Sequence, residues 1–104
     1  MTFYRIYVIV KKVRGYCAAG YKPGDKFVIE RFYILPLQEA KICLHALNSM
    51  LTFIMPFSKG VSAKSLGIGD KDDVGYVQCP DPGDPYTRGG TVIFELRRER
   101  IGTS

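Results

Sequence analysis

The sequence has no tryptophan, a single histidine and only three cysteines, and these shortages narrow the classes of site it can build. Thiolate metal sites usually take two ligands from a C-x-x-C pair, and the chain contains no such pair. Disulfide-stapled secreted proteins use an even and denser set of cysteines than the three widely spaced ones here. We therefore predict a cytoplasmic protein.

Long apolar runs are also missing. No stretch reaches the roughly 18 to 20 uninterrupted apolar residues that a membrane span requires. The apolar start of the chain has Lys11 and Lys12 behind it, whereas a leader peptide carries its charge ahead of its apolar run. The sequence thus predicts a strand at the N-terminus and no membrane partner.

What is present is typical of one folded domain, spanning residues 1–104. Apolar residues make up 46% of the chain and charged residues 24%, which excludes a disordered segment. The net charge of +5 favours anionic partners such as nucleic acid. Side-chain amides are scarce, a composition that fits a heat-adapted protein, and are limited to Gln38, Asn48 and Gln78.

Alternating apolar residues predict long strands over residues 3–14 and 91–100, and shorter ones over 26–33 and 74–79. Between them, residues 36–57 have the spacing of a helix, with Pro36 suited to its first turn and Pro56 and Gly60 at its end. The order is β-β-α-β-β. We expect an α+β fold in which a small antiparallel sheet of about four strands packs against one long helix.

The predicted helix is apolar around most of its circumference. At about 100° per residue, its polar positions, including His45, fall in one narrow stripe, and apolar residues fill an arc of more than about 200°. A sheet covers a stripe of about 100° or somewhat more. Either the loop after the helix or a second subunit must cover the rest. The sequence therefore predicts a homodimer with contact through the helix or a sheet edge.

Four short motifs occur in order along the chain. They are Cys17–Gly20 followed by Gly24–Phe27, then Cys43–Leu47, then Cys79–Pro82, and finally V-x-F-E-x-R over residues 92–97. Together they resemble a family of small bacterial and archaeal proteins of similar length. That resemblance implies an architecture and no reaction, because the family has no established activity.

The three cysteines form one candidate metal site. Cys17 and Cys79 fall at loop and strand ends, where ligands to zinc or an iron–sulfur cluster can converge, and Cys43 would be the third. His45 is excluded as a fourth ligand, because in an intact helix it lies about 160° from Cys43. Two alternatives stay open: a reactive thiol at Cys17, and a structural role for Cys43 as a small buried residue.

Positive charge gathers toward the ends of the two long predicted strands. If these strands pair, the charges would form one basic strand edge for RNA or single-stranded nucleic acid, with tyrosines as stacking faces. The alternative is a solvated basic edge, because Glu95 and Glu99 interrupt the arginines. The candidate nucleic-acid-binding residues are Lys11, Lys12, Arg14, Arg97, Arg98 and Arg100.

No catalytic residues are predicted. The loop aspartates, such as Asp25 and Asp81, suit turns, and the glycine-rich loops lack both the dinucleotide and the P-loop pattern. The sequence favours a binding or assembly module without catalysis. The alternatives are a thiol-dependent metal-binding or redox protein that uses Cys17 and Cys79, and a nucleic-acid-binding protein.

Overall fold

Two long strands form the centre of the molecule. The computed structural model describes residues 2–35 and 41–103. Strand β1 (Thr2–Gly15) pairs antiparallel with β5 (Gly90–Thr103) along nearly their whole lengths. Within the described residues the sheet has five strands in the order β3-β2-β1-β5-β4. The outer strands are β2 (Lys26–Glu30), β3 (Tyr33–Ile34) and β4 (Val74–Gln78).

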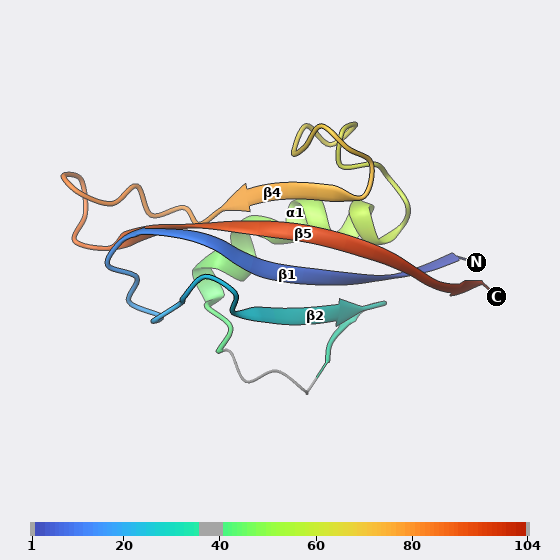
Figure 1. The fold of residues 1–104 in the computed structure, drawn as a ribbon, viewed down its shortest axis with the longest axis horizontal. Helices are drawn as coiled ribbons and strands as arrows, with labels where there is room; N and C mark the ends of the chain where they lie inside the picture. Colours follow the sequence, from blue (N-terminus) through green and yellow to red (C-terminus); the bar gives the residue numbers. More distant parts are fainter. Residues whose placement is uncertain (1, 36–40, 104) are drawn as a thin grey trace.

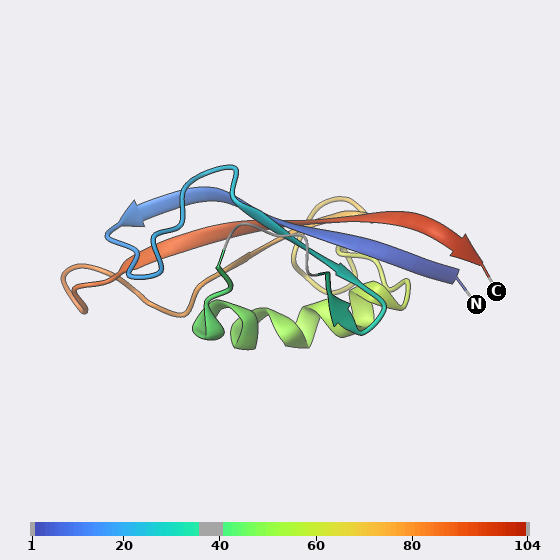
Figure 2. The same ribbon diagram turned by 90° about the horizontal axis from the view of Figure 1, so that it is seen from below.

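Helix α1 (Leu44–Ser58) covers one face of this sheet and leaves the other face open (Figures 1 and 2). Because side chains alternate along a strand, the even-numbered residues of β5 and, up to Val10, of β1 face the helix. They form the core with one stripe of α1, and the odd-numbered residues form the open face. Beyond Val10 an irregularity in the pairing reverses this order in β1, so Val13 packs against the core and Lys12 lies on the open face. The core includes Ile6, Val8, Val92, Phe94 and Leu96 from the strands, and Met50, Ile54 and Phe57 from the helix.

The predicted α+β class and antiparallel sheet are confirmed, but the number of strands differs. Residues 26–33 do not form one strand. The chain turns at Arg31, which has a φ of 59°, and returns as the two-residue strand β3. Within the described residues, no helix combines the length and the apolar character needed to cross a membrane.

The predicted helix starts too early. Residues 36–40 lie outside the described residues, and residues 41–43 are not helical. Cys43, which was expected inside the helix, is the residue before its first turn, with φ −73° and ψ 125°. Pro56 does not end the helix either, because the helix continues to Ser58. Gly60 follows with a φ of 102°, a conformation that favours glycine.

A buried tyrosine fixes the start of α1. The hydroxyl oxygen of Tyr21 accepts a hydrogen bond of 2.7 Å from the backbone N–H of Cys43. The first four N–H groups of a helix have no partner within the helix, and the Cys43 side chain does not cap them. Tyr21 therefore satisfies one of these groups from a distant loop, while its ring packs edge-on against Phe94 with centroids 5.7 Å apart.

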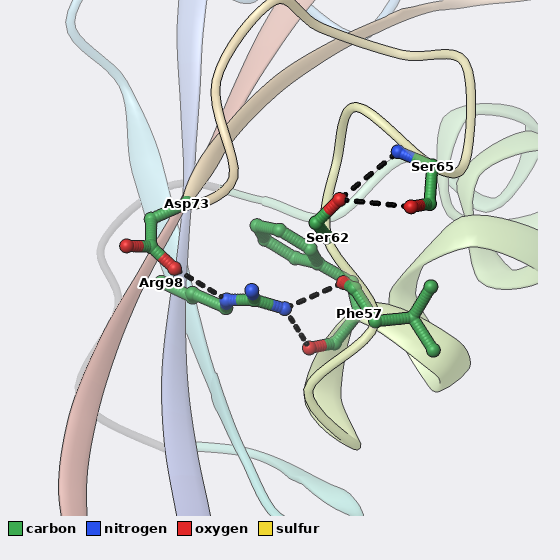
Figure 3. A network of polar contacts seen from close by, with 6 residues as sticks. Phe57, Ser62, Ser65, Asp73 and Arg98 are labelled. Carbon is green, nitrogen blue, oxygen red and sulfur yellow. Dashed lines mark hydrogen bonds and ion pairs between the residues drawn. The ribbon is translucent and has the colours of Figure 1, made fainter.

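A buried arginine holds the other end of the helix (Figure 3). The Arg98 Nη1 atom donates to the carbonyl oxygens of Phe57 at 2.9 Å and Val61 at 2.6 Å, and its Nε donates to Asp73 at 2.8 Å. The guanidinium carbon also lies 4.5 Å from the ring centroid of Phe57 and 4.7 Å from that of Tyr4. Arg98 thus joins β5, the end of α1 and the loop before β4.

We expect Arg98→Met to lower the free energy of unfolding by about 2–4 kcal/mol, because charge-assisted hydrogen bonds contribute about 1.5–3 kcal/mol and each ring contact adds to them. The free energy of unfolding of Arg98→Lys should lie between those of the unsubstituted protein and Arg98→Met. The lysine keeps the charge, but an ammonium group has no planar fork to reach both the carbonyls and the carboxylate. Urea unfolding monitored by circular dichroism measures the difference. The control is Arg100→Met, an exposed position for which a change within about 0.5 kcal/mol is expected. Equal losses at both positions would contradict this role.

Candidate functional site

The three cysteines are free thiols that pack, partly buried, against the hydrophobic core. Cys17 and Cys43 lie near Tyr21, and burial raises the pKa of the Tyr21 phenol although its hydrogen bond with the Cys43 backbone acts to lower it. Cys79 faces a different loop. Its sulfur accepts the backbone N–H of Asp81 at 3.4 Å and lies 3.8 Å from the carbonyl oxygen of Gly90.

Across residues 2–35 and 41–103, no group of three or more histidine, cysteine, aspartate or glutamate side chains is close enough to hold a metal ion. His45 lies exposed in the first turn of α1. The angle of about 160° expected between His45 and Cys43 assumed that both lie in one helix. Cys43 precedes the helix, so this angle does not separate them. The metal site on Cys17, Cys43 and Cys79 therefore stays a prediction.

Asp81 organises the loop between β4 and β5. Its Oδ1 atom accepts hydrogen bonds from the Gly83 N–H at 2.9 Å and from the Thr87 hydroxyl, and these bonds lower the pKa of the Asp81 carboxyl. The Thr91 hydroxyl donates to the Asp81 carbonyl oxygen at 2.6 Å. The loop packs closely around this carboxyl, since a Cβ atom on Gly89 would lie 1.8 Å from it. Asp81 therefore has the turn-forming role that its sequence context suggests.

The six predicted nucleic-acid-binding cations do not form one edge. The strands that carry them, β1 and β5, lie inside the sheet, and antiparallel pairing puts the end of β1 beside the start of β5. Alternation separates the arginines as well: Arg97 is on the open face, and Arg98 and Arg100 are on the helix side. Arg98 is already engaged with the end of α1, and its side chain is only 4% exposed.

The open face instead contains a different set of cations. Lys12 lies opposite Ile93, Arg14 opposite Thr91 and Lys26 opposite Ile9 in the strand pairing. With Lys11 and Arg97 they form what we call the basic patch: Lys11, Lys12, Arg14, Lys26 and Arg97. Lys26 was not among the predicted cations, because the sequence alone does not show which strand lies beside β1.

Glu95 lies within the basic patch and is only 3% exposed, although the sheet face around it is open. Its carboxylate accepts hydrogen bonds from Arg97 Nε at 2.7 Å and from the Tyr76 hydroxyl at 3.1 Å, and Lys11 Nζ is 3.7 Å away. Desolvation acts to raise the pKa of Glu95, but the two hydrogen bonds and the charges of Arg97 and Lys11 outweigh it. The net effect lowers the pKa of Glu95.

Two shallow hollows flank the side chain of Tyr76, which is 46% exposed on the open face. One has a volume of about 250 Å³ and is lined by Tyr76, Val77, Gln78 and Ile93. The other, of about 220 Å³, lies between Tyr76, Val74, Arg97 and residues 69–71. Both are smaller than the roughly 300–1,000 Å³ of pockets for drug-sized ligands.

The outer side of α1 carries a second unusual surface. Leu44 is 77% exposed, and Leu51 and Met55 are each 41% exposed. At about 100° per residue these three side chains fall within an arc of about 40°, on the side of the helix away from the core residues. We call these three residues the outer stripe. It is the part of the apolar arc that the sheet leaves uncovered.

The edges of the sheet are short or partly covered. On the outer side of β4, the backbone N–H of Tyr76 donates to the carbonyl oxygen of Ile68 at 2.7 Å, and the Ser49 hydroxyl donates to the carbonyl oxygen of Gln78 at 3.4 Å. The opposite edge strand, β3, is only two residues long. Short or covered edges disfavour pairing with another strand.

Comparisons of the chain with protein-family models, with curated proteins and with solved structures found no match.

The lowered pKa of Glu95 predicts a pH dependence of stability. Above its ordinary pKa of 4.5 the ionised carboxylate contributes fully, and the contribution is lost as the pH falls through the lower folded-state value. We expect Glu95→Gln to lose about 1.5–3 kcal/mol of unfolding free energy at pH 7. The difference from the unsubstituted protein should shrink below about pH 4.5, because protonation then removes the same charge from the latter.

Urea unfolding of both proteins at several pH values measures this difference. Glu99→Gln is the matched control, since its carboxylate is exposed and has a single hydrogen bond of 3.1 Å from Tyr7. A loss from Glu95→Gln that stays constant from pH 7 to strongly acidic solution would refute the electrostatic explanation.

Proposed function

We propose that the protein is an assembly module without catalytic activity, and that it forms a homodimer through the outer stripe of α1. The observation that carries this proposal is the exposure of Leu44, Leu51 and Met55 along one narrow line of a helix. Contiguous exposed apolar surface on a folded protein is typical of an interaction site.

A second copy is the occupant that best fits this stripe. Two identical helices can pack against each other about a two-fold axis, so that the same apolar residues cover their counterparts. The short and partly covered edges favour this arrangement over the alternative of strand-to-strand pairing. The stripe also has polar neighbours, His45 and Thr52, on its flank, as the rim of an interface usually does.

The available area predicts a weak dimer. A specific interface needs about 1,000 Å² in total, or about 500 Å² from each copy. That is less than a tenth of the protein surface of 6656 Å². A helix of 15 residues is about 22 Å long and about 10 Å wide, so the outline of its outer side, about 220 Å², supplies a little under half of the area needed from each copy. The exposed ring of Phe32 adjoins the end of the helix, with Lys59 Nζ 4.7 Å from its centroid.

We expect the protein to be a dimer at about 100 µM and to dissociate on dilution into the low micromolar range, as interfaces of this size do. The double substitution Leu51→Glu with Met55→Glu should give a monomer at about 100 µM, because it would bury like charges against each other. Size-exclusion chromatography with light scattering measures the mass directly.

The matched control places a charge on the polar side of the same helix: Thr52→Glu should stay dimeric. Both variants must keep the circular dichroism spectrum of the native fold. A monomeric mass for the unsubstituted protein at about 100 µM would contradict the proposal. Dissociation of the Thr52→Glu control to the same extent as the double variant would contradict it as well.

A further inference from the structure

We propose that the open face of the sheet binds single-stranded nucleic acid. In this proposal the basic patch contacts the phosphates, and the ring of Tyr76 stacks on a base. The proposal does not depend on the homodimer, because α1 and the open face lie on opposite sides of the sheet (Figure 2).

Three of the five cations of the basic patch are available to a ligand. Lys12, Arg14 and Lys26 are exposed and have no ion-pair partner in the part of the chain that the structure describes. Lys12 and Arg14 lie near the end of β1 and Lys26 begins β2, and Figure 1 shows these two strand ends joined by one loop. Free cations in one place are what a phosphate backbone requires, because its binding free energy comes from displacing condensed counterions.

A β-bulge concentrates this charge. The pairing of β1 with β5 steps from Val10 opposite Phe94 to Lys12 opposite Ile93, which leaves Lys11 as an extra residue. Lys12 shares the open face with Ile93, and Lys11 reaches Glu95 on that face at 3.7 Å. Two consecutive lysines therefore lie on one side of the sheet, where regular alternation would place them on opposite sides.

The acidic residues of the open face do not cancel the patch. Glu95 is buried and already paired with Arg97 and Lys11. Glu30 pairs with Arg5 at 3.1 Å, and Glu99 lies opposite Arg5 in the sheet. Arg5 is seven residues before Lys12 along β1, about 23 Å at 3.3 Å per residue, and four residues before Ile9, the partner of Lys26, about 13 Å. Both spacings exceed the Debye length of about 8 Å at physiological salt, so these two carboxylates are largely screened from the free cations Lys12, Arg14 and Lys26.

The position of Tyr76 also favours a nucleic-acid ligand. It belongs to the same cross-strand row as Glu95, Ile9 and Lys26, so the ring and the free lysine share a line across the sheet. Hollows of about 250 and 220 Å³ on its two flanks leave space beside an aromatic side chain. Stacking on an exposed aromatic ring needs an unpaired base, which a duplex does not offer. The combination of a basic patch with this ring favours a single strand over a duplex or an anionic membrane.

Fluorescence anisotropy tests the proposal with a labelled single-stranded oligouridylate, the corresponding oligothymidylate, a blunt DNA duplex of equal length, heparin and anionic phospholipid vesicles. We expect the single strands to bind more tightly than the other probes, with an affinity that falls as salt rises. Equal or tighter binding of duplex, heparin or vesicles would overturn the proposal, because it would show a general attraction to polyanions.

Charge-reversal variants locate the binding surface. The patch variant combines Lys12→Glu, Arg14→Glu and Lys26→Glu. The matched control combines Lys41→Glu, Lys64→Glu and Arg100→Glu, three exposed cations outside the basic patch. Both triple substitutions lower the net charge of +5 by six, to −1. We expect the patch variant to lose affinity at least about tenfold more than the control. Equal losses would mean that net charge alone drives binding, and would overturn the assignment to the open face.

A pair of substitutions at Tyr76 separates stacking from structure. Tyr76→Phe and Tyr76→Leu both remove the hydroxyl group that donates to Glu95, but only the first keeps the ring. We expect Tyr76→Phe to bind single strands as the unsubstituted protein does, and Tyr76→Leu to bind about fivefold more weakly or worse. Equal affinities of the two variants would remove Tyr76 from the proposal. Light scattering of the same samples keeps this outcome separate from the oligomeric state.

Discussion

The long antiparallel pairing of β1 with β5 is the constraint on which the rest of the structure depends. Each strand has 14 residues, and side-chain alternation along both of them gives the sheet two chemically different faces. One side supplies the aliphatic and aromatic core that holds α1. The other side carries tyrosines, carboxylates and most of the free cations. Which cations lie together follows from this division rather than from their closeness in sequence.

Arg97 and Arg98 show how strongly the division acts. They are neighbours in the chain, yet Arg97 pairs with Glu95 on the open face, and Arg98 is buried against Phe57 on the helix side. Tyr21 and Arg98 hold the two ends of α1 with side chains from outside the helix. The helix is thereby fixed against the sheet at both ends, although its outer stripe is left uncovered.

The sequence predicted the class of fold and the location of the two long strands, because alternating valines, isoleucines and aromatic residues report a sheet with one buried face. It did not predict the start of the helix, since a hydrogen bond from Cys43 to a tyrosine 22 residues away decides it. The basic patch was predicted only in part. Four of its members were candidates: Lys11, Lys12, Arg14 and Arg97. Lys26 was not, because its place depends on which strand pairs beside β1. Arg98 was predicted at the nucleic-acid surface, but its side chain is buried on the helix side.

The bulge at Lys11 has a trace in the sequence and a consequence for how the strand tolerates change. The buried positions of β1 run Val8, Val10 and then Val13, so the spacing changes from two to three at the extra residue. Deleting one lysine there would restore an uninterrupted ladder and would leave Val13 opposite Val92 and Arg14 opposite Thr91, because the bulged residue has no partner of its own. The deletion would remove one cation from the open face and would change nothing on the core side. The extra residue therefore adds charge to that face without serving the pairing of the two strands.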